Sequence, residues 1–128
     1  MVLLDTQLVL WAALQLQRLP AKVATLLGPR DTVVAISVVT LWEVAITTSL
    51  ARADFNVDVE ALRRWLLSEA FTELSIAPGH VMRVAQLPWV HRDRFDRLLV
   101  AQAQVEGVPL WTADVTLKGY GKAIKVVA

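Results

Sequence analysis

The chain of 128 residues is 55% hydrophobic and 20% charged, which suits one globular domain with a core of its own and excludes a disordered chain. It contains no cysteine, which excludes a disulfide framework and a thiolate metal site and agrees with a cytoplasmic location. The net charge is +1, so no global field attracts nucleic acid and any basic contact surface must be local.

Residues 1–16 are apolar enough to suggest a signal peptide, but Asp5 interrupts them and no basic residue precedes it. The longest uncharged runs, residues 6–17 and 32–42, are too short to cross a bilayer. The mean hydropathy of +0.49 indicates apolar surface that a partner covers. We therefore expect a cytoplasmic protein that has no membrane segment and that binds a partner.

Short apolar segments alternate with helical patterns along the chain. The expected strands are residues 2–4, 32–36, 71–76 and 108–112, with 124–127 as a last edge strand. The expected helices begin at Thr6, Pro20, Val38, Asp58, Pro78 and Asp93, and a helical turn follows Asp114. In the helix from Asp58, the stripe of Leu62, Trp65 and Leu66 should face inward. This alternation predicts one α/β domain over residues 1–128 with a mainly parallel sheet of four or five strands.

Four acidic residues occupy positions that place them near one edge of such a sheet. Asp5 directly follows the first strand, and Asp114 lies two residues after the fourth. Open parallel sheets bind their ligands outside the carboxyl ends of the strands, at a topological switch point. Glu43 lies in the middle of a helix, with no cation three or four residues away. Asp96 lies in the first turn of the helix that Asp93 is expected to cap.

Each of these acids, taken alone, also has a structural explanation. Asp5 and Asp114 fit helix caps, and Glu43 fits a solvated surface position. Asp93 and Asp96 fit a capping pair that only begins a helix. Caps and turns do not, however, require acids at two strand ends together with a third inside an apolar helix. The joint pattern therefore favours a common site.

Convergence of these carboxylates would restrict the chemistry of the site. Two carboxylates about 4 Å apart repel by about 4 kcal/mol at an effective dielectric constant near 20, so a cluster must bind cations or take up protons. Oxygen ligands without histidine or cysteine suit Mg²⁺ or Mn²⁺, the ions of phosphodiesterases that use metal-activated water. His80 and His91 have no zinc-site spacing and are expected to be surface or loop histidines. No Walker loop and no GxGxxG motif occurs.

Four stretches of the sequence resemble the PIN domains, and among them the VapC-type toxins of bacterial and archaeal toxin–antitoxin pairs. They are residues 3–6 (LLDT), 36–45 (ISVVTLWEVA), 91–103 (HRDRFDRLLVAQA) and 110–114 (LWTAD). The four stretches come in the family's order and span almost the whole chain. The resemblance implies an α/β/α sandwich and a Mg²⁺- or Mn²⁺-dependent endoribonuclease that cleaves RNA.

The resemblance also implies the roles of individual residues. The acids that match the family's catalytic and metal-binding positions are Asp5, Glu43, Asp96 and Asp114. Thr6 and Thr112 match positions where a hydroxyl often supports the acids, whereas Asp93 matches no metal ligand. Two departures, Arg94 where many relatives have proline and Gln7 after the Asp-Thr pair, remove no ligand but leave the substrate open.

Three functions remain possible at this level. The first is a ribonuclease toxin, a homodimer held by a cognate antitoxin protein. The second is a PIN-type nuclease that acts on DNA or in RNA processing without an antitoxin, and the third is a binding module with a spent site, which four intact acids argue against. Around Asp96, Arg92, Arg94 and Arg97 are the candidate RNA-binding residues, and we expect at least one of them to contact the RNA backbone, although a solvated charge run explains them equally well.

Overall fold

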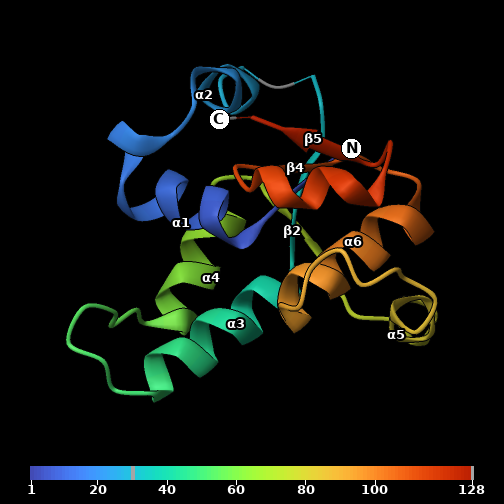
Figure 1. Cartoon of the computed structure of the whole chain (residues 1–128). Coiled ribbons are helices and arrows are strands. Elements are labelled where there is room, and N and C mark those ends of the chain that lie inside the picture. Colours follow the sequence, from blue (N-terminus) through green and yellow to red (C-terminus); the bar gives the residue numbers. More distant parts are fainter. Residues whose placement is uncertain (30, 128) are drawn as a thin grey trace.

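A parallel five-stranded sheet forms the centre of the protein in the computed structural model, which describes residues 1–29 and 31–127 (Figure 1). The strands are β1 (Val2–Leu4), β2 (Val34–Ser37), β3 (Thr72–Leu74), β4 (Leu110–Thr112) and β5 (Ile124–Val126). Their order across the sheet is β3-β2-β1-β4-β5, and every neighbouring pair is parallel. The α/β class and the parallel sheet predicted from the sequence are confirmed.

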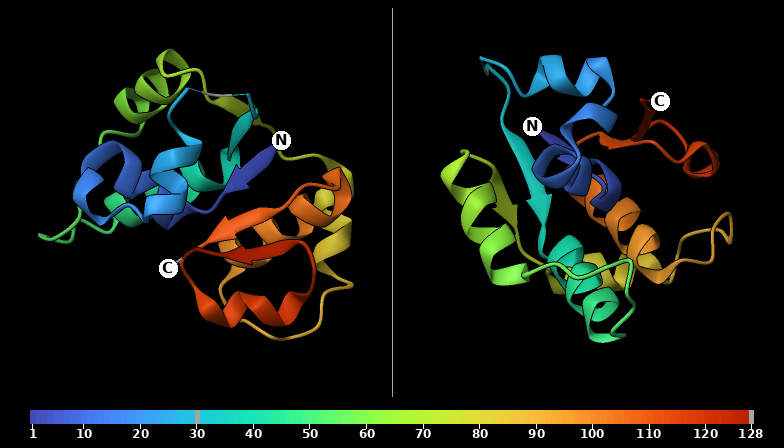
Figure 2. Two further views of the ribbon diagram at one scale, coloured as in Figure 1. Left: turned by 90° about the horizontal axis from the view of Figure 1, so that it is seen from above. Right: turned by 90° about the vertical axis from the view of Figure 1, so that its left-hand side faces the viewer.

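Helices cover both faces of this sheet. They are α1 (Thr6–Leu14), α2 (Ala21–Leu26), α3 (Val38–Ser49), α4 (Val59–Ser68), α5 (Pro78–Val84) and α6 (Arg94–Glu106), with short 3₁₀-helices η1 (Leu16–Arg18) and η2 (Val115–Tyr120). Figure 2 shows α1, α2 and α4 on one side of the strands and α5, α6 and η2 on the other. No helix in the described part of the chain combines the length and the apolar character needed to cross a bilayer.

The central strands β1 and β2 are buried along their whole length because helices cover both faces of the sheet there. In β1, Leu3 packs with Leu99 and Leu110 on the side of α6. Its neighbour Leu4 points to the opposite face and packs with Leu8 of α1 and other apolar side chains. Leu3 and Leu4 are both fully buried, and burying a leucine side chain contributes about 1.5–3 kcal/mol.

Asp5 caps α1, which is one of the two interpretations that the sequence allowed for it, since its side chain accepts a hydrogen bond from the backbone N–H of Leu8. One local prediction is wrong. Trp65 was expected to face inward with Leu62 and Leu66 but is 37% exposed. The inward stripe of α4 is thus narrower than its apolar pattern suggested, and Trp65 lies at its margin.

Two glycines in different backbone conformations give a matched test of the helix ends. Gly107 ends α6 in the left-handed conformation, with φ of +67°. Gly107→Ala should therefore lower the free energy of unfolding by about 1 kcal/mol. Gly79 lies in α5 with open space around its Cα, so Gly79→Ala should raise it by about 0.5–1 kcal/mol. Urea unfolding of both variants checks the opposite signs, and equal shifts would contradict this assignment.

Candidate active site

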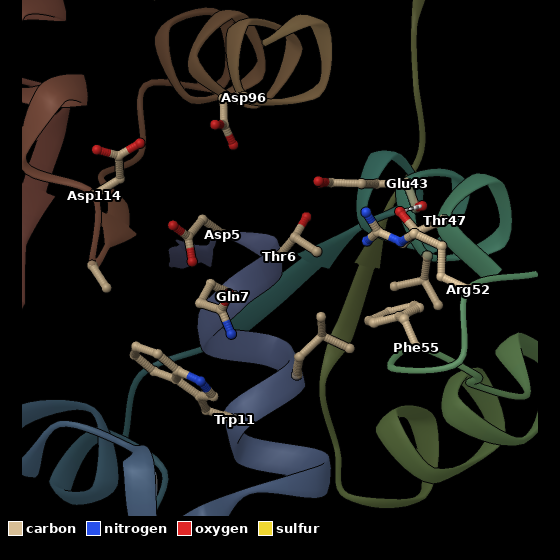
Figure 3. A pocket seen from close by; sticks show the side chains of 13 residues that line it. Asp5, Thr6, Gln7, Trp11, Glu43, Thr47, Arg52, Phe55, Asp96 and Asp114 are labelled. Carbon is tan, nitrogen blue, oxygen red and sulfur yellow. Dashed lines mark hydrogen bonds between the residues drawn. The ribbon is translucent and has the colours of Figure 1, made fainter. Parts of the chain in front are cut away.

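Four acidic side chains from four elements line one cavity of about 580 Å³. Asp5 follows β1, Asp114 follows β4, Glu43 lies on α3 and Asp96 on the first turn of α6. Figure 3 shows all four carboxylates turned into this space. β1 and β4 are neighbours at the point where the strand order reverses, so the cavity lies at the switch point of the sheet. The structure thus brings together all four acids that the sequence singled out.

Asp5 is held rigidly in an almost fully buried position. Its Oδ1 accepts the N–H of Leu8 at 2.9 Å, and its Oδ2 accepts the hydroxyl of Thr112 at 2.5 Å. Burial raises the pKa of the Asp5 carboxyl, with a smaller rise from the charge of Asp114, and these hydrogen bonds only partly offset the increase. The surroundings of Asp5 therefore do not fully compensate the charged form of its carboxyl.

Two threonine hydroxyls lie behind the acids, at the positions that the sequence proposed as supports. Thr112 donates to Asp5 and accepts the backbone N–H of Asp114 at 2.9 Å, so one hydroxyl connects two of the acids. Thr6 lies 3.0 Å from the hydroxyl of Thr40, and both threonines are buried. These contacts fix the geometry of the cavity wall between β1, β4 and α3.

The spacing between Glu43 and Asp96 is set by contacts between their helices. Beside them in sequence, Trp42 and Phe95 meet edge to face, with ring centroids 4.8 Å apart and an interplanar angle of 84°. At the start of α3, the hydroxyl of Ser37 donates to the buried amide oxygen of Gln102 on α6. Helices α3 and α6 are thereby joined at two points, one of them directly beside the acids in sequence.

Glu43 is half-buried, and no hydrogen-bond partner reaches its Oε1 within the described residues. Burial raises the pKa of the Glu43 carboxyl, the Thr6 hydroxyl lowers it, and the charges of Asp93 and Asp5 raise it further. The sequence left two alternatives for Glu43, solvation or a partner from elsewhere. The structure provides neither in full, and a buried oxygen without a partner remains.

The pKa of Asp96 is strongly raised. Burial, followed by the charges of Asp93, Glu43, Asp5 and Asp114, raises the pKa of Asp96 to about 7. Asp93 itself caps α6, as predicted, by accepting the backbone N–H groups of Phe95 and Asp96 at 2.8 and 3.0 Å. The positive end of the α6 dipole does not overcome this crowding of negative charge.

Asp114 differs from the other acids because donors surround it. Burial alone would raise the pKa of its carboxyl, but hydrogen bonds from Thr116 and the nearby His91 outweigh burial and lower it. His91 Nε2 lies 3.2 Å from Asp114 Oδ2 and 3.7 Å from Asp96 Oδ2. Asp114 is therefore the acid that keeps its charge most readily.

His91 was expected to be a surface or loop histidine without a role, and the structure places it beside the acids. Ligand-type atoms of His91, Asp96 and Asp114 all lie within 4.8 Å of one another. However, His91 Nδ1 accepts the backbone N–H of Asp93 at 3.0 Å, which leaves the ring proton on Nε2. A protonated Nε2 donates and does not ligate a metal, so His91 orients Asp114 as a hydrogen-bond donor.

His80 is also not the surface histidine that was expected. It is 1% exposed in α5, where its Nδ1 accepts the backbone N–H of Ala77 and its Nε2 lies 2.8 Å from a carboxylate oxygen of Glu106. This histidine ties α5 to the end of α6, away from the cavity.

The three arginines around Asp96 have different environments. Arg92 and Arg94 are exposed and free to meet a substrate. Arg97 is 4% exposed, and its guanidinium donates to the carbonyls of Pro88, Val84 and Leu87 and to the hydroxyl of Tyr120. The expectation that Arg97 contacts RNA is therefore corrected, because protein acceptors occupy its donors and Arg97 holds the loop before α6 in place.

The cavity also has a side that sequence patterns did not reveal. Gln7, Trp11, Arg52 and Phe55 line it together with the acids (Figure 3). Arg52 and Phe55 belong to the loop between α3 and α4, which has no recognisable motif.

Comparison with known proteins identifies the family of this chain. A family model for the PIN domain matches residues 2–123. The chain belongs to the PIN domain family. A comparison with curated proteins finds no match.

Solved structures show the same PIN fold. VapBC2 from Rickettsia felis, bound to a DNA fragment from its promoter, is 16% identical with a TM-score of 0.70, over 98% of this chain and 97% of that chain. A toxin–antitoxin complex from Klebsiella pneumoniae is 21% identical with a TM-score of 0.70, over 100% and 98%. VapBC-5 from Mycobacterium tuberculosis is 22% identical with a TM-score of 0.59, over 98% and 95%. At these identities the likeness concerns the fold.

The donor set of this PIN domain fits a divalent metal ion. Burial and mutual repulsion raise the pKa values of Asp5, Glu43 and Asp96, so the charged forms lack compensation. Glu43 Oε1 adds a buried acceptor with no partner among the described residues. A cation of the Mg²⁺ or Mn²⁺ type supplies what these oxygens lack.

The raised pKa of Asp96 predicts how the metal-free protein responds to pH. Between pH 3.8 and about 7 the folded state keeps a proton that the unfolded chain has released, so stability falls as the pH rises. The slope approaches 1.4 kcal/mol per pH unit at most, roughly, and Asp96→Asn should flatten it. Urea unfolding in EDTA from pH 4 to 8 measures this. Asp58→Asn changes the same atoms in an exposed helix cap and is the control. Parallel curves for the parent and Asp96→Asn would refute the assignment.

Proposed function

We propose that this protein is a Mg²⁺- or Mn²⁺-dependent endoribonuclease and the toxin of a type II toxin–antitoxin pair. Membership in the PIN family supports nuclease activity. The observation that carries the proposal is the convergence of four carboxylates in one cavity at the switch point of the sheet, three of them with raised pKa values. Such a cluster lowers the stability of the fold when no cation is bound, so a functional site explains it better than a structural role does. Its oxygen ligands are those of metal sites that hydrolyse phosphodiesters.

Each site residue then has a defined task. Asp5, Glu43, Asp96 and Asp114 would hold the ion. When bound, it lowers the pKa of a water molecule and offsets negative charge on the phosphodiester. Thr112 holds Asp5 and the backbone of Asp114, while His91 fixes the carboxylate of Asp114. With its pKa raised to about 7, Asp96 can hold a proton near neutral pH when no cation is present.

Exposed apolar surface supports the proposal that this protein binds protein partners. A second hollow of about 400 Å³, lined in part by Leu10, Leu14, Phe55 and Val57, adjoins the acid cavity and provides a surface for an antitoxin segment. The solved structures with this fold include toxin–antitoxin complexes. Trp89, 79% exposed in the loop after α5, and Met82, 68% exposed on α5, offer apolar surface for a homodimer.

Asp5→Asn tests the metal site directly. Asparagine retains the shape and the cap but removes the charge, so RNA cleavage should fall by at least about 100-fold. Mg²⁺ should stabilise the parent, by about 2.7 kcal/mol at 100 times its Kd, and the variant much less. The measurements are melts with Mg²⁺ and with EDTA, together with cleavage of an oligoribonucleotide and of DNA of the same sequence.

Asp58→Asn, at the exposed cap of α4, should behave as the parent in every assay. If Asp5→Asn cleaves RNA normally and Mg²⁺ leaves the melting temperature of the parent unchanged, the assignment of the metal site is wrong. Cleavage of DNA alone would favour the nuclease without an antitoxin.

Arg92 and Arg94 are the proposed contacts to the RNA backbone. The double change to glutamine should weaken RNA binding and reduce its salt slope by about 0.7 for each phosphate that is no longer neutralised, with little effect on stability. Arg97→Gln should instead lower the melting temperature, because it leaves buried carbonyls without their donor. Binding titrations at several salt concentrations, with Arg64→Gln on α4 as the control, separate the two effects. A parent-like slope for the double variant would exclude these contacts.

A further inference from the structure

The residues that line the acid cavity besides the carboxylates have the composition of a nucleotide-binding surface. Trp11 and Phe55 are partly buried aromatic residues there, and Gln7 is an exposed amide beside them. The space of about 580 Å³ lies within the range of roughly 300–1,000 Å³ that is usual for small-molecule pockets. None of these residues has a task in the carboxylate cluster.

Arg52 brings positive charge to this surface. Among the described residues that line the cavity, it is the one cationic side chain. Its ion pair with Asp54 is long, at 3.8 Å, and the two side chains are 56% and 83% exposed. Exposed pairs of this kind are weak, so the guanidinium is available to a phosphate group.

The aromatic side chains supply flat apolar contact next to that charge. Phe55 and Leu10 also line the adjoining hollow, so the apolar surface continues beyond the acid cavity. Stacking on aromatic rings beside a basic group is how proteins hold unpaired bases, whereas bases inside a duplex hide their faces. The charge and the rings together therefore select a single-stranded nucleotide.

We propose that Arg52, Phe55 and Trp11 form a subsite for one unpaired RNA nucleotide next to the carboxylate cluster. Arg52 contacts its phosphate and the ring of Phe55 receives its base. Trp11, whose ring has the Arg18 guanidinium over it at 5.8 Å, borders the base together with the amide of Gln7. This subsite rests on the ribonuclease function proposed above, and it makes an unpaired nucleotide beside the scissile phosphate a requirement of the substrate.

Binding without cleavage tests the subsite. Fluorescence anisotropy of a labelled single-stranded oligoribonucleotide, titrated in EDTA, compares the parent with Arg52→Gln and Phe55→Leu. We expect each variant to bind about tenfold more weakly, and the salt slope of Arg52→Gln to fall by about 0.7. Arg64→Gln and Trp65→Leu, matched changes at exposed positions on α4 outside the cavity, should bind as the parent does. Melts of all variants identify any that fail to fold.

Phe55→Leu should also reduce discrimination between the single strand and the same sequence as a duplex. Parent-like affinity and salt slope in Arg52→Gln, an equal weakening in the Arg64→Gln control, or no measurable binding by the parent would overturn the subsite. Cleavage with Mg²⁺ is a separate readout. If the parent does not cleave RNA but Arg52→Gln and Phe55→Leu still weaken binding, the ribonuclease function is overturned and the subsite stands. If the parent cleaves RNA but both variants bind as the parent does, the subsite is overturned and the ribonuclease function stands.

Discussion

Repulsion between buried carboxylates is the constraint on which the site depends. Asp5 and Asp114 are brought together because β1 and β4 are neighbours in a parallel sheet and end at the same edge. Glu43 and Asp96 are added by helices that the Trp42–Phe95 contact and the Ser37–Gln102 hydrogen bond hold together. The apolar core on both faces of the sheet supplies the free energy that keeps these like charges close. The raised pKa of Asp96 reflects their burial and their mutual repulsion.

The sequence predicted what depends on local rules. Apolar segments located the strands. Positions after a strand or in a first helical turn located Asp5, Asp114 and Asp96, and Glu43 stood out as an acid inside an apolar helix without a nearby cation. Prediction failed where the environment of a side chain comes from distant residues. Arg97 is embedded in the same charged run as Arg92 and Arg94, yet it is buried by a loop that approaches from α5 and by η2. Arg52 and His91 lie in loops without periodicity, so only tertiary structure reveals their neighbours.

The loop between α5 and α6 is part of the site although none of the four cavity acids belongs to it. Arg97 binds carbonyls of this loop, its guanidinium stacks over Trp89 at 3.9 Å, and Tyr120 of η2 accepts the backbone N–H of His91 at 3.0 Å. These contacts determine where the imidazole of His91 meets Asp114. The acid that keeps its charge most readily is thus oriented by a segment fixed from outside the sheet.

Gly119 shows how far this dependence extends. A Cβ atom at this position would lie 2.7 Å from a methyl carbon of Val90, the residue directly before His91. Bulk added on η2 would therefore push the loop, and with it the imidazole, without touching the cavity. Whether a substitution impairs activity should therefore depend on whether the residue contacts this loop, and not on its distance from the acids. A random mutant library would then yield inactive yet folded variants at Gly119, a position that no inspection of the carboxylates would single out.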